Sequence, residues 1–240
     1  ELTGDKKTAM DMYKLAVKIR REVNGAESPE LAHVLLLLAQ LCFEEDRLDE
    51  AETYVGECLS IQQNVHPTAA LTSAAAGVSI PDEAVVHILP VLVLHPSAAE
   101  SASLMGSICK AHVRYNDAKI WFLYAVDVVR AVRGPVNNDI AIILTNLAIL
   151  NKEVGQMQEA VRLYEEALAI RRQLFKGQSP FIAQSLNNLA VVRKDMGQCA
   201  EAKRLFEDAV RMYQACNGGS EESAEVAAAY NNLAGCLHDM

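Results

Sequence analysis

Amide and ammonium side chains that recur at a nearly fixed interval are the residues of this chain best suited to chemistry. Asparagine pairs stand at 187–188 and 231–232, and a Thr-Asn pair stands at 145–146. An asparagine amide donates and accepts hydrogen bonds at once, so a row of such pairs can bind the backbone of an extended peptide. The predicted peptide-binding residues are Lys110, Thr145, Asn146, Lys152, Asn187, Asn188, Lys194, Asn231 and Asn232.

Lysines continue these rows. Lys110, Lys152 and Lys194 repeat every 42 residues, and the last two follow the polar pairs by seven residues, nearly two turns of a helix. Ammonium groups predict a preference for peptides with an acidic residue or a carboxyl terminus, weakening with salt. However, Glu153 and Asp195 each follow a lysine directly. These acids could neutralise the lysines and leave a solvated face of little energetic weight, and the sequence leaves both interpretations open.

Side chains for catalysis or metal binding show no comparable arrangement. The six cysteines form no C-x-x-C pair, and the six histidines form no H-x-x-x-H pair. The sequence therefore predicts no metal site and no cofactor. A nucleophile motif and a Gly-rich phosphate loop are also missing, so we expect a protein that is not an enzyme.

Net charge and hydropathy limit the classes of partner that the chain can bind. A net charge of -9 argues against binding to nucleic acid, RNA included, or to anionic lipid. No stretch reaches the roughly 18 apolar residues of a membrane span, so no membrane insertion is expected. The cysteine usage fits a reducing compartment, and we expect a cytoplasmic or cytoskeleton-associated protein, with organelle import through an upstream segment left open.

An acidic run at residues 44–57 holds seven acids against one arginine. One interpretation is a docking surface for a basic partner. The other is that Asp46, Asp49 and Glu50 cap and charge the N-terminus of a helix, where the helix dipole favours anions.

Small residues reveal the elements that must position these side chains. Ala148, Ala190 and Ala234 follow one another at 42 and 44 residues, and alanines recur in further columns of the same register. Each unit contains two segments with apolar residues at helical spacing, separated by a turn with Gly155 or Gly197. Such a unit is a helical hairpin whose small residues let its two helices cross closely, so the fold class is an all-α solenoid of antiparallel hairpins.

We expect a single repeat array over 1–240. Its parts are a second helix of a partial repeat at 6–22, repeats at 30–64, 97–132, 138–174 and 180–215, a truncated hairpin at 67–94, and a first helix of a partial repeat at 222–239. An array that opens on a second helix and closes on a first helix lacks capping repeats, so a fragment of a longer protein is expected.

The truncated hairpin is inferred from a break in the period. Ala51 and Ala118 are equivalent positions but lie 67 residues apart, and His-Pro pairs at 66–67 and 95–96 frame the surplus. Pro90 would kink or end the second helix of this short hairpin. The alternative is a long apolar loop, a less common feature of compact domains.

The segments "SPFIAQSLNNLAVVRKDMGQCAEAKRLFEDAV" and "NDIAIILTNLAILNKEVGQMQEAVRLYEEALAIRRQLF" resemble tetratricopeptide repeats of the 42-residue form found in kinesin light chains. The resemblance implies a right-handed superhelix with a concave face lined by first helices. It also places such asparagine positions in a ligand groove and implies a non-enzymatic role in binding peptides or partner proteins.

Two functions remain in competition. In the first, the chain is a scaffold or adaptor that binds peptide segments of partner proteins in the concave groove. In the second, it is a structural subunit fixed in a large assembly through convex surfaces and the apolar segment 84–94, with Ile88, Leu89, Val91 and Leu92.

Overall fold

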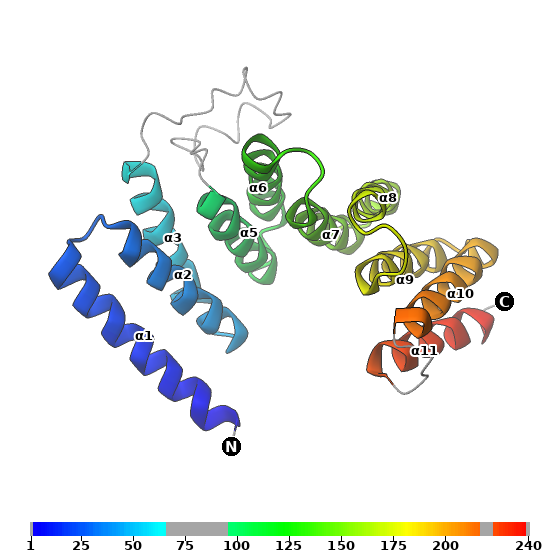
Figure 1. Cartoon of the computed structure of the whole chain (residues 1–240), viewed down its shortest axis with the longest axis horizontal. Coiled ribbons are helices and arrows are strands. Elements are labelled where there is room, and N and C mark those ends of the chain that lie inside the picture. The colour runs from blue at the N-terminus through cyan, green and yellow to red at the C-terminus, as the bar shows by residue number, and fades with distance from the viewer. Residues whose placement is uncertain (1, 66–95, 217–222, 239–240) are drawn as a thin grey trace. The chain divides into compact units, whose positions relative to one another are not determined.

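The computed structural model describes residues 2–65, 96–216 and 223–238, and every regular element within these ranges is an α-helix (Figure 1). The predicted all-α repeat fold is confirmed. The helices are α1 (Leu2–Asn24), α2 (Pro29–Glu44), α3 (Leu48–Val65), α5 (Pro96–Ala111), α6 (Tyr115–Arg133), α7 (Asn138–Glu153), α8 (Met157–Leu174), α9 (Pro180–Asp195), α10 (Cys199–Cys216) and α11 (Ala224–His238).

Two compact units divide these helices. Unit 1 spans Glu1–Gly134 and unit 2 spans Pro135–Met240. Within unit 1 the hairpins are α2–α3 and α5–α6, with α1 packed on α2; within unit 2 they are α7–α8 and α9–α10, with α11 packed on α10. The single array over 1–240 and its superhelical course stay predictions. The expected hairpin at 67–94 lies outside the described residues.

Serine and proline start two of the first helices in the same way. The Ser28 hydroxyl accepts a hydrogen bond from the backbone N–H of Leu31 at 3.2 Å, and Pro29 occupies the first turn. Ser179 and Pro180 start α9 similarly, with the Ser179 hydroxyl accepting from the backbone N–H of Phe181 at 3.3 Å. The cap satisfies a backbone donor that the helix leaves unpaired, and proline at this position sacrifices no helical hydrogen bond.

One turn position in each hairpin takes left-handed backbone geometry. Gly155 and Gly197 have φ angles of 79° and 75°, and the equivalent Asp46 and Val113 have φ angles of 59° and 61°. Glycine and, to a lesser degree, aspartate tolerate this region, whereas a β-branched valine does not. Val113 is therefore the strained member of the column.

In the complete hairpins the predicted alanine columns lie where the two helices cross, whereas Ala234 of α11 is exposed. Ala190 and Ala202 are completely buried and pack in one cluster with Phe206 and Cys236. In unit 1 the corresponding position is Gly106, where an added Cβ would lie 2.9 Å from the ring of Phe122. A small residue at this position therefore lets the neighbouring helix approach closely.

Buried polar contacts join successive hairpins inside each unit. Gln62 of α3 donates to the Ser101 hydroxyl of α5 at 3.1 Å. At the equivalent place in unit 2, Arg171 of α8 donates to the Ser185 hydroxyl of α9 at 2.7 Å and to the Phe181 carbonyl at 3.1 Å. Burial lowers the pKa of the Arg171 guanidinium. Each contact fixes the register between a second helix and the following first helix.

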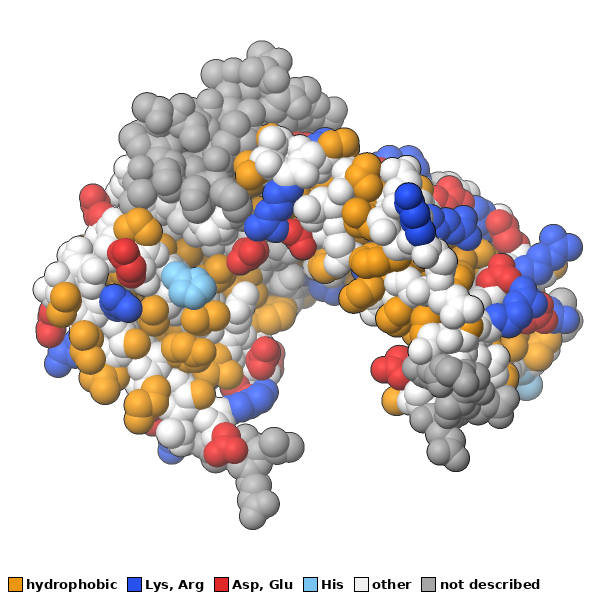
Figure 2. All heavy atoms as spheres, in the orientation of Figure 1, with side chains coloured by type: hydrophobic (Ala, Val, Ile, Leu, Met, Phe, Trp, Pro, Cys, Tyr) orange, Lys and Arg blue, Asp and Glu red, His pale blue; other side chains and the backbone are white. Residues whose placement is uncertain are grey.

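Helix α1 exposes an apolar stripe, and hydrophobic side chains are visible at the surface over the N-terminal helices (Figure 2). Ile19 is 49% exposed, whereas the equivalent Val128 and Ile170 are 0% and 8% exposed. Those two residues belong to second helices that pack against the first helix of their own hairpin. The stripe consists of Met12, Leu15, Ile19 and Val23.

Enlarging a crossing alanine is expected to destabilise the protein. Ala190→Leu or Ala202→Leu should lower the free energy of unfolding by ~1 to 3 kcal/mol, because a completely buried crossing has no room for the extra carbons. The exposed change Lys176→Ala serves as the control. Equal shifts for both classes in a urea melt would contradict the assigned register.

Replacing the strained Val113 with glycine is expected to stabilise the protein. Val113→Gly should raise the free energy of unfolding by about 0.5 to 1 kcal/mol, because relief of left-handed strain outweighs the added chain entropy of glycine. Gly155→Val should lower it by a similar amount, and space is not the reason, since nothing lies within 4 Å of a Cβ added there. Thermal melts of both variants measure the strain, and a destabilised Val113→Gly protein would show that it is absent.

Candidate functional site

The predicted polar rows lie on one side of three first helices in unit 2. In α7 and α9 the buried residues pack inside the hairpins, and in α11 they pack toward α9 and α10; we call the surface that carries the predicted polar residues of these three helices the first-helix face. Asn231 is exposed on it, and the other predicted residues of unit 2 are half-buried. These half-buried residues are Thr145, Asn146, Lys152, Asn187, Asn188, Lys194 and Asn232. Lys110 lies on α5 in unit 1, where it is also half-buried.

Two asparagines of the face bind each other. The Asn232 amide donates to the side-chain oxygen of Asn187 at 2.9 Å, so it links α11 to α9. This bond is diagonal, because Asn232 is the second member of its pair and Asn187 is the first member of the preceding pair. It orients both amides and uses one donor and one acceptor that a ligand could otherwise engage.

Other amides keep their full hydrogen-bonding capacity. Among the described residues, no partner is found for the side chains of Asn146 and Asn188, which occupy equivalent places on α7 and α9. Asn231 is likewise without a described partner. Thr145 differs, because its hydroxyl donates to the carbonyl of Ala141 at 2.7 Å. The face therefore presents unpaired amides on α7 and α9.

Each lysine of the face extends toward the following first helix, Lys152 from α7 to α9 and Lys194 from α9 to α11. The ammonium of Lys152 on α7 lies 2.7 Å from a carboxylate oxygen of Asp195 on α9, and both side chains are about one-third exposed (33% and 34%). Lys194 extends toward α11, where its Nζ lies 3.3 Å from the place that a Cβ on Gly235 would occupy. At Lys152 the structure thus realises the interpretation in which a neighbouring acid neutralises the lysine.

Apolar residues between the polar rows were not recognised from the sequence. Ile142 is exposed, and Ile149 and Val191 are half-buried on the same side of α7 and α9 as the asparagines. Their spacing of three or four residues from Asn146 and Asn188 is the signal that would have found them. They add apolar contact area beside the amides.

A family model described as tetratricopeptide repeat matches residues 2–64, 97–173 and 139–215. The chain belongs to the tetratricopeptide repeat family. This result confirms the resemblance seen in the sequence. Tetratricopeptide repeats are scaffolds for protein–protein interaction, and the family is generally non-enzymatic. No curated protein matches the chain.

Solved structures similar to this tetratricopeptide chain include kinesin light chain-like proteins. A variant of a putative kinesin light chain from Podosopora anserina, with nearly identical repeats, has a TM-score of 0.70 at 21% identity over 91% of each chain. BtubC (BKLC) from P. vanneervenii has a TM-score of 0.68 at 24% identity over 90% of this chain and 76% of its own. The apo form of RapI has a TM-score of 0.63 at 14% identity over 97% of this chain and 60% of its own. At these identities the likeness shows the fold.

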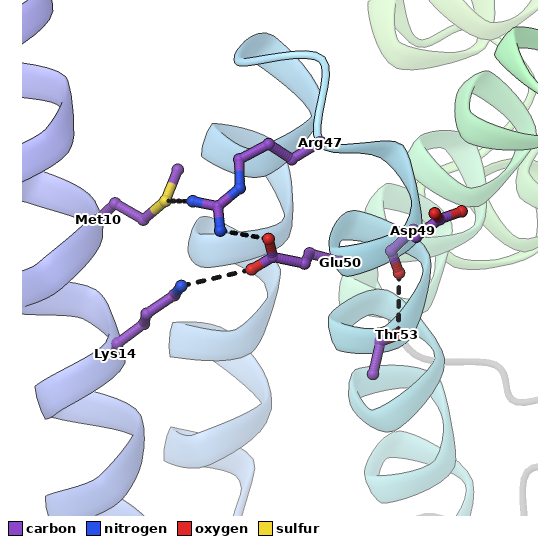
Figure 3. A network of polar contacts seen from close by, with 6 residues as sticks. All are labelled: Met10, Lys14, Arg47, Asp49, Glu50 and Thr53. Atoms are coloured by element: carbon purple, nitrogen blue, oxygen red, sulfur yellow. Dashed lines mark hydrogen bonds and ion pairs between the residues drawn. The ribbon is translucent and has the colours of Figure 1, made fainter.

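The acidic run of this tetratricopeptide array pairs with neighbouring helices. Glu50 accepts hydrogen bonds from Lys14 of α1, at 3.3 Å, and from Arg47, whose guanidinium also contacts the sulfur of Met10 (Figure 3). Burial acts to raise the pKa of Glu50, but the hydrogen bonds from Arg47 and Lys14 outweigh it and lower the pKa.

Further acids of the run are also paired with basic side chains of unit 1. Glu52 accepts from Arg114 at 2.6 Å, Glu57 pairs with Arg21, and Lys6 lies 3.0 Å from Glu45 and 3.5 Å from Glu44. Asp49 and Glu50 lie in the first turn of α3, as expected for acids at a helix N-terminus. Much of the negative charge therefore serves contacts inside unit 1.

Candidate metal ligands and cysteine thiols were located in the described part of the chain. No group of three or more His, Cys, Asp or Glu side chains there could hold a metal ion. Burial raises the pKa of Cys58 and Cys109 to about 11, so both thiols stay protonated at neutral pH. None of the described helices is both long and apolar enough to cross a membrane.

The pairing of Glu50 predicts a pH dependence. A carboxyl group with a lowered folded-state pKa contributes stability above its unfolded pKa and loses it as pH falls through the folded value. Glu50→Gln should therefore lower stability at pH 7 by under ~1 kcal/mol and make acid unfolding below about pH 4.5 less steep. Urea melts between pH 3 and pH 7 measure both effects. The exposed Glu30→Gln is the control, and matching profiles for the two variants would contradict this assignment.

Proposed function

We propose that the chain is an adaptor whose first-helix face in unit 2 binds an extended peptide segment of a partner protein. The observation that carries this proposal is the pair of unpaired amides at Asn146 and Asn188, on equivalent places of α7 and α9. Amide groups without protein partners are available to a ligand at no cost in broken internal bonds.

The chemistry of an amide row suits a peptide backbone. An extended chain presents N–H donors and C=O acceptors at regular intervals, and each asparagine can meet one of each. Such bonds do not depend on the side chains of the ligand. Ile142, Ile149 and Val191 beside the row would contact apolar side chains of the peptide and add buried area.

Selectivity for acidic peptides, and the cytoplasmic or cytoskeletal location, remain predictions from the sequence. Lys152 and Lys194 supply the positive charge that such selectivity needs, but Lys152 is held by Asp195. Hydrogen bonds from the amides to the peptide backbone do not depend on these charges.

The second candidate function is a structural subunit of a large assembly. The apolar stripe of α1 favours it, because exposed hydrophobic side chains in a row are typical of surfaces that another protein covers. The segment 84–94, which also suggested this function, lies outside the described residues. Peptide binding by unit 2 would support the adaptor over the structural subunit.

The test is peptide selection followed by substitution of the free amides. A random decapeptide display library is selected on the purified chain, and enriched peptides are synthesised and titrated by fluorescence anisotropy. Asn146→Ala with Asn188→Ala should weaken their binding by ~1 to 3 kcal/mol, because hydrogen bonds are lost, and should leave the thermal midpoint nearly unchanged. Asn187 is less suitable, since its substitution also removes the bond from Asn232.

A matched control changes two exposed amides on a second helix. Gln158→Ala with Gln173→Ala removes the same kind of group from α8, away from the first-helix face, and should bind the peptides as the wild type does. Enriched peptides that bind the Asn146/Asn188 variant unchanged would exclude this face as the site. A library that yields no enriched peptide would favour the structural subunit.

A further inference from the structure

The ion pair between Lys152 and Asp195 stands where helix electrostatics alone would not place an acid. Asp195 is the last residue of α9, and Lys152 lies in the last turn of α7. The C-terminal end of a helix carries partial negative charge, which favours a lysine and disfavours an aspartate. Asp195 thus gains nothing from its own helix, and the compensating interaction is the 2.7 Å contact with Lys152 across the first-helix face.

We propose that Asp195 is a specificity-determining residue that keeps the first-helix face from selecting acidic peptides by holding the Lys152 ammonium. This inference rests on the peptide-binding function proposed above and deepens it. It names the preferred ligand as a peptide without an acidic residue at the position that contacts Lys152.

The physical basis of this specificity is competition between Asp195 and a ligand carboxylate for the Lys152 ammonium. A ligand carboxylate could reach this ammonium only by displacing Asp195 or by sharing the lysine with it. Displacement breaks a formed ion pair, and sharing brings two carboxylates close together, which like-charge repulsion opposes. Either route reduces the gain from an acidic ligand, while a neutral ligand bound through Asn146 and Asn188 is unaffected.

Other charged groups nearby do not restore a positive surface. Glu153 is exposed beside Lys152 at the end of α7, and Lys194 is directed toward Gly235 of α11. The two lysines are therefore matched by two acids, Glu153 and Asp195, at this end of the face. Removing the charge of Asp195 alone shifts the balance by one unit and frees the ammonium of Lys152.

The experiment measures charge preference and not only affinity. Peptides enriched on the wild type from the random decapeptide library are resynthesised with Asp or Asn at each position in turn and titrated at low salt. At the position that contacts Lys152, Asp195→Asn is expected to raise the ratio of Asp-peptide to Asn-peptide affinity about two- to fivefold, an effect that shrinks as salt rises.

Two further variants separate an effect of the Asp195 charge on peptide preference from an effect on protein stability. Lys152→Gln combined with Asp195→Asn removes both charges and should return the ratio to the wild-type value, which a mere loss of stability would not do. Asp208→Asn breaks the ion pair with Arg211 inside α10 and should leave the ratio unchanged.

The outcomes are distinct. A raised ratio in Asp195→Asn that the double variant reverses supports the inference. Peptides that bind through Asn146 and Asn188, with the same ratio in wild type and Asp195→Asn, overturn the inference and leave the proposed function standing. Failure to enrich any peptide on the wild type overturns the proposed function and this inference with it.

Discussion

Close helix crossing at the small-residue columns is the constraint on which the rest of the structure depends. Ala148, Ala160, Ala190 and Ala202 are completely buried, and at Gly106 even a methyl group would meet the ring of Phe122. Because the two helices of a hairpin meet at these points, the rotation of each helix about its axis is fixed. That rotation decides which residues are buried and which remain on the first-helix face.

The amide row follows from this rotation and from the repeat length. Asn146 and Asn188 stand two residues before the crossing alanines Ala148 and Ala190, so both face solvent on the same side of their helices. A ligand on this face would meet one amide per hairpin without any rearrangement of the core. The proposed site is thus a by-product of packing geometry, and we expect its residues to be replaceable without loss of the fold, as is typical of function placed on a repeat scaffold.

Helical periodicity and small-residue spacing were sufficient to predict the repeat fold, because both signals come from the buried faces and are read directly from residue types. The side-chain partners on the face were not predictable in the same way. From the sequence, Lys152 could pair with Asp195 or remain free, and Asn187 and Asn232 belong to different columns although they bind each other. Such choices depend on rotamers and on the offset between adjacent helices, which a linear spacing does not contain.

The net charge of such a protein says little about its partner, because many charged side chains are paired with one another. The acidic run at 44–57 left a basic partner open, but several carboxylates of the chain already have a cation from elsewhere in their own unit. Lys14 and Arg21 of α1 bind Glu50 and Glu57 of α3 in unit 1, and Lys152 plays the same part between two first helices in unit 2. Each exposed pair contributes little stability, yet each removes a charge from the recognition surface. Around Asn146 and Asn188 the groups offered to a ligand are neutral, namely these unpaired amides and the isoleucines beside Asn146, so hydrogen-bond geometry should dominate recognition there over net charge.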